Sequence, residues 1–113
     1  MDNIRNGSEF VLKHMYKIYL DRLEEGESSS QSKYFGSCEE LQQKYFIGHT
    51  YNQLHDCINE LSFNNYLNVT YGSNVPCAII LENSSIAYFE KEYSKKAKSL
   101  IKDLNNLRQL LGF

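Results

Sequence analysis

Two helix starts that lie only thirteen residues apart restrict the fold of this chain more than any other feature of its sequence. The segments from Ser37 to Glu40 and from Thr50 to Gln53 both match the capping-box pattern Ser/Thr-x-x-Glu/Gln. In this pattern a hydroxyl and an amide or carboxylate reciprocally satisfy N–H groups that a helix start leaves unpaired. The sequence therefore predicts a short helix, a tight corner and a second helix.

A hairpin is predicted directly after the second of these helices. The segments from Tyr66 to Tyr71 and from Cys77 to Leu81 are rich in β-branched and aromatic residues. Between them, Gly72, Ser73 and Asn74 have the chemistry of a turn. This order of helix, corner, helix and hairpin is the layout of a winged helix-turn-helix domain. The predicted fold class is α+β, with a three-helix core, a two-stranded β-wing and an additional long C-terminal helix.

The first core helix is predicted near the start of the chain. Apolar side chains recur there at spacings of three and four, namely at Val11, Leu12, Met15, Ile18, Tyr19 and Leu23. This spacing predicts an amphipathic helix that ends near Gly26. We expect residues 1–7 to be a flexible N-terminus and residues 8–90 to be the winged domain. Within that domain, the polar segment 26–36 is predicted to be a flexible loop.

Composition limits the classes of protein to which the chain can belong. Its 113 residues are enough for about one domain. With 12 Lys and Arg against 14 Asp and Glu, the chain lacks the overall basic excess of many nucleic-acid-binding proteins. No apolar run approaches the roughly 18 to 20 residues that span a bilayer, and no charged-then-apolar leader opens the chain. We therefore expect a cytoplasmic protein with no membrane partner.

The sequence offers no motif for catalysis, a metal or a cofactor. Cys38, Cys57 and Cys77 are odd in number and widely spaced, which argues against a disulfide framework. His49 and His55 lie near Cys57 but do not have the spacing of metal ligands. A Gly-rich phosphate loop, a nucleophile elbow and a paired-carboxylate motif are also missing from the sequence. We expect no enzymatic activity, no metal and no cofactor.

The outer side of the helix that starts after Thr50 is the predicted nucleic-acid contact surface. Leu54 and Leu61, with Cys57 or Ile58 between them, repeat at helical spacing and should face the core. In a helix-turn-helix protein the opposite side enters the major groove, where Asn and His reach base edges and Tyr reaches phosphates. The predicted contact residues are Tyr51, Asn52, His55 and Asn59. An ordinary solvated helix face is the alternative.

Positive charge is scarce around this predicted surface. Between Tyr45 and Glu90 there is no Lys or Arg, although cations supply most non-specific affinity for DNA. Contacts with the DNA backbone must therefore come from other parts of the chain and from hydrogen bonds of the wing. The residues predicted for these contacts are Lys13, Lys17, Lys33, Lys44, Tyr71, Ser73 and Asn74.

Residues 91–113 are predicted to form one amphipathic dimerisation helix. Its apolar seam, with residues three and four apart, consists of Ala97, Leu100, Ile101, Leu104, Leu107 and Leu111. The alternative is that this helix folds back on its own domain. Its cations, at spacings of four, three and four, are Lys91, Lys95, Lys98 and Lys102. We interpret them as a basic stripe that attracts a nucleic-acid backbone or an acidic partner, or else as a solvated face.

The sequence after the second closely spaced helix resembles a known bacterial pattern. Leu-Ser-Phe-Asn-Asn-Tyr-Leu at 61–67, the hairpin, and Leu-Glu-Asn-Ser-Ser-Ile-Ala-Tyr-Phe-Glu at 81–90 are similar to Leu-x-x-x-Gly-Tyr-Leu, wing, Leu-Thr-x-x-Gly-x-x-Tyr-Leu. The chain resembles the YjcQ-like family of small winged-helix proteins from Gram-positive bacteria and their phages, and its layout is similar to PadR-type regulators. Asn65, Glu82 and Ser85 depart from the pattern. The resemblance implies DNA binding and transcriptional control.

Two functions are compatible with these observations. The first is a dimeric winged-helix protein that binds double-stranded DNA as a transcriptional regulator of bacterial, phage or mobile-element origin. The alternative is a winged-helix interaction module that binds another protein instead of DNA. Binding that weakens steeply with salt would distinguish DNA from a protein partner.

Overall fold

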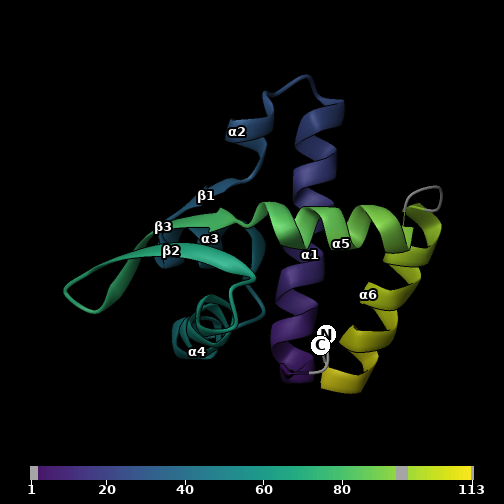
Figure 1. The fold of residues 1–113 in the computed structure, drawn as a ribbon. Helices are drawn as coiled ribbons and strands as arrows, with labels where there is room; N and C mark the ends of the chain where they lie inside the picture. Colours follow the sequence, from purple (N-terminus) through teal and green to yellow (C-terminus); the bar gives the residue numbers. More distant parts are fainter. Residues whose placement is uncertain (1–2, 94–96, 113) are drawn as a thin grey trace.

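The computed structural model describes residues 3–93 and 97–112, which form six helices and a three-stranded antiparallel sheet (Figure 1). The helices are α1 (Asn6–Glu24), α2 (Ser29–Ser32), α3 (Cys38–Tyr45), α4 (Tyr51–Phe63), α5 (Asn83–Tyr93) and α6 (Ala97–Leu111). The strands are β1 (Tyr34–Gly36), β2 (Leu67–Gly72) and β3 (Val75–Leu81). The predicted α+β class is confirmed. No helix in the described ranges combines the length and apolar character needed to cross a membrane.

Both predicted capping boxes are confirmed at the starts of α3 and α4. The Ser37 hydroxyl accepts a hydrogen bond from the Glu40 N–H at 3.2 Å, and the Glu40 carboxylate accepts one from the Ser37 N–H at 3.4 Å. The Thr50 hydroxyl and the Gln53 amide form the same reciprocal pair at 3.1 and 3.0 Å. These local bonds fix where each helix begins, so the corner between α3 and α4 is only five residues long.

The predicted hairpin is formed by β2 and β3. The two strands are paired in antiparallel register from Leu67 opposite Leu81 to Gly72 opposite Val75. At the tip, Ser73 and Asn74 have φ values of 52° and 65°, in the left-handed region. A two-residue turn with both residues left-handed matches the twist of an antiparallel pair.

The segment 26–36, which we expected to be a loop, contains α2 and β1. Helix α2 begins where the Ser28 hydroxyl accepts a hydrogen bond from the Gln31 N–H. Strand β1 adds a third strand to the hairpin, in the order β1-β3-β2, with Tyr34 opposite Ile80. The prediction was wrong because a three-residue strand is held by its partner strand and has too few residues to show a pattern of its own.

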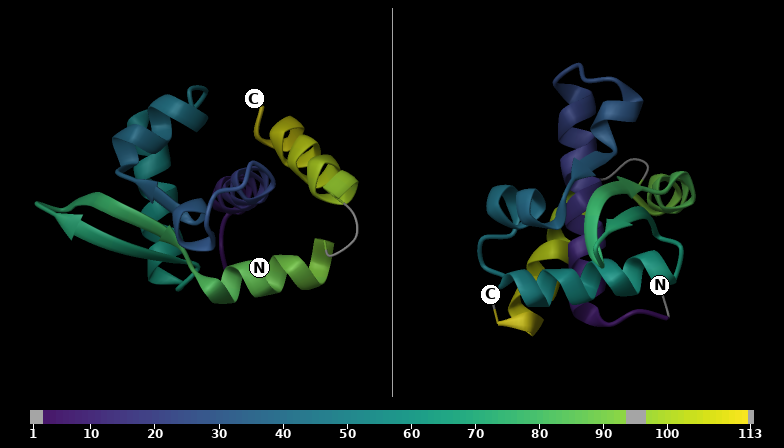
Figure 2. Two further views of the ribbon diagram at one scale, coloured as in Figure 1. Left: turned by 90° about the horizontal axis from the view of Figure 1, so that it is seen from above. Right: turned by 90° about the vertical axis from the view of Figure 1, so that its left-hand side faces the viewer.

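Helix α1 occupies the middle of the molecule, with α4 and the sheet on one side and α6 on the other (Figure 2). The helix begins at Asn6, so the described part of the predicted flexible N-terminus is not free. The Arg5 backbone and side chain donate hydrogen bonds to the Glu60 carboxylate of α4 at 3.3 and 3.1 Å, and the Ser8 hydroxyl donates to the same oxygen. Met1 and Asp2 lie outside the described residues.

The C-terminal region consists of two helices, which corrects the prediction of one helix over 91–113. Helix α5 ends at Tyr93 and α6 begins at Ala97, and the two run in different directions (Figure 1). Helix α6 packs against α1 of its own chain, where Leu100 is fully buried and Leu104 is 7% exposed. In this structure the segment therefore folds back on its own domain, which is the alternative that the sequence left open.

Most of the residues predicted for a dimer seam take part in this contact within the chain. Leu100 and Leu104 belong to the core of the single chain, and Leu107 and Leu111 pack partly buried against it. On this helix Ile101 remains exposed at 43%. The side chain of Ala97 lies outside the described part. The reason for the difference is that α1 has a second apolar side, which the chain covers with its own helix without the entropy cost of bringing two molecules together.

Candidate nucleic-acid interface

Helix α4 buries one side and presents the other to solvent, as the sequence predicts. The residues that it buries are Leu54, Cys57, Ile58 and Leu61. On the opposite side Asn52 is exposed, while Tyr51, His55 and Asn59 are partly exposed. The rings of Tyr51 and His55 stack with their centroids 5.8 Å apart. Of the four predicted contact residues, Asn52 is therefore the one whose side chain is most accessible to a partner.

The β2–β3 hairpin lies beside α4 and is joined to it by a side-chain hydrogen bond. The Tyr71 hydroxyl donates to the Asn59 side-chain oxygen at 2.8 Å. Two residues that the sequence predicted as separate contacts, one on the helix and one on the wing, are thus paired with each other. Ser73 and Asn74 at the tip of the hairpin are both exposed. Helix α4 and the hairpin consequently form one continuous surface.

Lys13 does not belong to this surface, which corrects its prediction as a backbone contact. Its side chain is only 9% exposed, and its amine lies 3.1 Å from Glu9 and 3.5 Å from Asp103 of α6. The amine also lies 5.7 Å from the centre of the Tyr93 ring. Burial alone would lower the pKa of Lys13, but the interactions with Tyr93 and Glu9 outweigh it and raise the pKa above its usual value. Lys13 is therefore a charged buried group that connects α1 to α5 and α6.

The other lysines predicted to contact phosphate come from α1, α3 and the residue before β1, and none of them lies on α4 or the hairpin. Lys17 forms an ion pair with Asp21 at 2.8 Å on α1, and Lys33 donates a hydrogen bond to Asn83 at 3.0 Å. Lys44 at the end of α3 is exposed and has no ion pair within the ranges that the structure describes. Lys33, which is bonded to a neutral amide, and Lys44 therefore keep a positive charge that no carboxylate of the described residues pairs with.

The predicted basic stripe is divided between two helices. Lys91 is exposed on α5 and Lys102 is exposed on α6. Because α5 ends at Tyr93, spacings of four, three and four across this region do not correspond to one helix face. Lys95 and the side chain of Lys98 lie outside the described residues.

Glu60 of α4 already forms an ion pair within the chain, with Arg5 at 3.1 Å. The burial of this carboxylate would raise its pKa, but hydrogen bonds from Ser8 and Arg5 lower it below its usual value. Asp56, one turn earlier, is exposed. The outer side of α4 therefore carries polar groups and one acidic group, and the sequence supplies no cation from residue 46 to residue 90.

Histidines near α3 and α4 are packed against aromatic rings. The ring of His49 stacks on that of Phe10 with centroids 5.9 Å apart. The ring of His14 meets that of Phe46 edge-on at 4.8 Å, and burial with the nearby positive charge of Arg108 lowers the pKa of His14 to about 4. No group of three or more His, Cys, Asp or Glu side chains in the described part of the chain could hold a metal ion.

Nothing in the sequence singles out Arg22, whose side chain lines a cavity between α1, β1 and α3. Its guanidinium group donates hydrogen bonds to the Tyr34 carbonyl at 2.7 Å and to the Tyr45 hydroxyl at 3.2 Å. These partners come from β1 and α3, which are far from Arg22 along the chain. A lone arginine in the last turn of a helix looks like an ordinary C-terminal cation, so only the folded arrangement distinguishes it.

Comparisons of this chain with protein-family models, curated proteins and solved structures found no significant match.

Proposed function

We propose that this chain is a winged helix-turn-helix domain that binds double-stranded DNA. Apart from the short α2, the elements from α1 to β3 follow the order of helix, strand, helix, helix and hairpin, and this order supports the assignment together with the sheet order β1-β3-β2. In such a complex α4 enters the major groove and the hairpin rests on the adjacent backbone. The observation that carries the proposal is the hydrogen bond between Tyr71 and Asn59, because it holds the helix and the wing as one polar surface.

Asn52 has the central role in this proposal. Its amide can donate to and accept from an adenine edge in the major groove, and it is exposed in the first turn of α4. Ser73 and Asn74 at the wing tip offer hydrogen bonds to phosphate oxygens or to the minor groove. Lys33 and Lys44 supply the nearby positive charge.

The small number of cations makes the salt dependence a sharp prediction. Each phosphate contact by Lys or Arg contributes a slope of about −0.9 to the dependence of log K on log salt. With Lys33 and Lys44 as the phosphate contacts, a single chain should show a slope of about −2. Two chains bound side by side should give about −4. Both slopes are much less steep than the slope of about −10 that a heavily charged repressor shows.

The experiment is fluorescence anisotropy of the purified protein with a mixed-sequence duplex of about 30 base pairs, across a salt series from about 20 to 200 mM. Asn52→Ala should reduce the preference among duplex sequences, and Lys44→Gln should weaken binding to all of them. Lys102→Gln is the matched control, because Lys102 is exposed on α6, away from the proposed surface. The mass of the complex by light scattering tests the predicted homodimer. An absence of binding at the lowest salt, to duplex and single strand alike, would refute DNA as the partner.

A protein partner is the second candidate, and a specific observation favours it. Ile47 before α4 is 77% exposed and Phe63 at its end is 86% exposed, on a helix with no cation. Large exposed apolar side chains near a weakly charged surface are typical of protein interfaces. In this case Ile47→Ser and Phe63→Ser would abolish binding to the partner and leave any affinity for DNA unchanged.

A further inference from the structure

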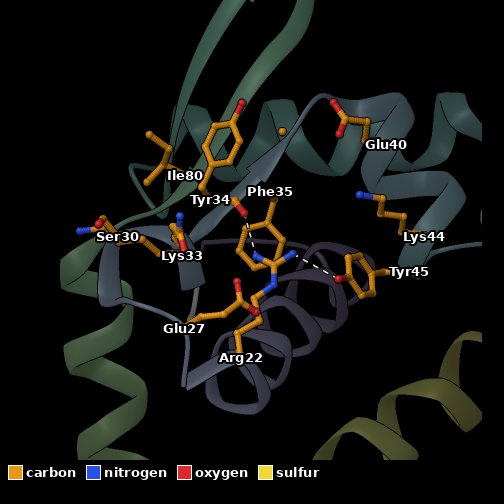
Figure 3. Close-up of a pocket in the computed structure, with 12 residues that line it drawn as sticks. Arg22, Glu27, Ser30, Lys33, Tyr34, Phe35, Glu40, Lys44, Tyr45 and Ile80 are labelled. Atoms are coloured by element: carbon orange, nitrogen blue, oxygen red, sulfur yellow. Dashed lines mark hydrogen bonds between the residues drawn. The ribbon is translucent and has the colours of Figure 1, made fainter. Parts of the chain in front are cut away.

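A cavity of about 730 Å³ opens between α2, β1 and α3, beside the last turn of α1 (Figure 3). Its volume lies within the range of roughly 300 to 1,000 Å³ that small-molecule sites occupy. Arg22 of α1, Tyr34 and Phe35 of β1, and Lys44 and Tyr45 of α3 all line it. Helices α1 and α3 and strand β1 thus bring cations and aromatic rings together around one cavity.

Arg22 is held in a fixed orientation in this cavity. One terminal nitrogen donates to the carbonyls of Tyr34 and Ser32 at 2.7 and 3.2 Å, and the other donates to the Tyr45 hydroxyl at 3.2 Å. The guanidinium carbon lies 4.6 Å from the centre of the Phe35 ring. Arginine has five N–H groups, and these bonds use three of them. The Nε–H and one terminal N–H have no hydrogen-bond partner among the described residues.

The charges that line the cavity favour an anion. The Lys44 side chain points toward the middle of the cavity, where the Arg22 guanidinium group also lies (Figure 3). Lys33 adds a third cation, and the acidic lining residues are Glu27 and Glu40. Glu40 already accepts the hydrogen bonds of its capping box. The lining therefore has one more positive than negative charge. Both carboxylates oppose an anion, but Glu40 is held at the Ser37 backbone, whereas the Glu27 carboxylate has no such bond among the described residues.

We propose that this cavity binds a phosphate monoester of about the size of a mononucleotide. The phosphate group would lie between Lys44 and the unused N–H groups of Arg22, because both side chains bind phosphate oxygens well. The planar part of the molecule would lie on the ring of Tyr34, which is 49% exposed. Lys33 and Lys44 also serve as phosphate contacts in the proposed DNA complex, but the cavity contains no residue of α4, so binding of a small phosphate ester can be measured without DNA.

The test is calorimetric titration of the full chain with adenosine monophosphate, followed by titration of three variants. Lys44→Gln should weaken binding about two- to fivefold, as expected for an exposed ion pair. Glu27→Gln should strengthen binding, because it removes an opposing charge from the same cavity. Lys102→Gln on α6 should leave the affinity unchanged. Unchanged thermal unfolding of each variant excludes loss of the fold as the cause.

Two further probes decide which part of the ligand is recognised. Adenosine, which lacks the phosphate, should bind at least tenfold more weakly than the monophosphate. Inorganic phosphate should also bind more weakly, because it cannot contact Tyr34. No binding of adenosine monophosphate at about 5 mM, or equal affinities for Lys44→Gln and Glu27→Gln, would overturn the proposal. Equal binding of inorganic phosphate would overturn the part that concerns the planar group.

Discussion

Replacing Leu100 by alanine tests whether α6 packs within its own chain. The Leu100 side chain is fully buried between α6 and the core. Truncation of a fully buried leucine removes its transfer free energy and leaves a cavity that the surroundings fill only partly. We expect Leu100→Ala to lower the free energy of unfolding by about 3 kcal/mol.

The expected change in melting temperature follows from the length of the chain. An unfolding entropy of about 2.1 cal/mol/K per residue gives about 0.24 kcal/mol/K for 113 residues. A loss of about 3 kcal/mol therefore corresponds to a decrease of about 13 °C in the melting temperature. Ile101→Ala is the matched control, because its side chain is 43% exposed on the same helix. Ile101→Ala should lower the free energy of unfolding by about 1 kcal/mol or less.

Circular dichroism during heating and in urea, at two protein concentrations about tenfold apart, measures both effects. If α6 packs on α1 of the same chain, the unfolding midpoints do not depend on concentration. If α6 instead joined two chains, the midpoints would rise with concentration, since dissociation would accompany unfolding. A concentration-dependent midpoint, or a loss below about 1 kcal/mol for Leu100→Ala, would refute the reasoning.

The remaining predictions concern stability. Burial lowers the pKa of His14 to about 4 in the folded state, whereas the unfolded chain takes up this proton near pH 6.5. The free energy of unfolding should therefore decrease as pH drops from 6.5 to 4. His14→Phe should reduce this decrease, as urea titrations at several pH values would measure. Asp103→Ala leaves Lys13 buried with one carboxylate fewer and should lower the free energy of unfolding by about 2 kcal/mol. Lys13→Met removes the buried charge and should lower it by less. The reverse order would contradict this arrangement. Thr50→Ala removes the cap of α4 and should lower the free energy of unfolding by about 1 kcal/mol, as chemical denaturation would measure. Thr50→Ser keeps the hydroxyl and should change this free energy little.

The candidate surface could be predicted only in part. The outer side of α4 follows from helical spacing alone, so Asn52 was assigned from the sequence and is exposed. The pairing of Tyr71 with Asn59 was not predicted, because it joins a helix to a strand twelve residues later. Lys13 was assigned to the surface because the segment between Tyr45 and Glu90 contains no Lys or Arg, so that cations had to come from other parts of the chain. Its partner Asp103 is 90 residues away and is brought near only by folding.

The sequence by itself determined the features that depend on a few neighbouring residues. The starts of α3 and α4 and the turn at Ser73 and Asn74 are set by hydrogen bonds and backbone preferences within about four positions. Only the tertiary structure decided that β1 joins the sheet, that α6 covers α1, and that Arg22 lines a cavity. Each of these depends on a distant partner, and the same apolar stripe on α6 would suit a second chain as well as α1. Because α1 belongs to the same molecule, its apolar side is always within reach, and α6 is buried there.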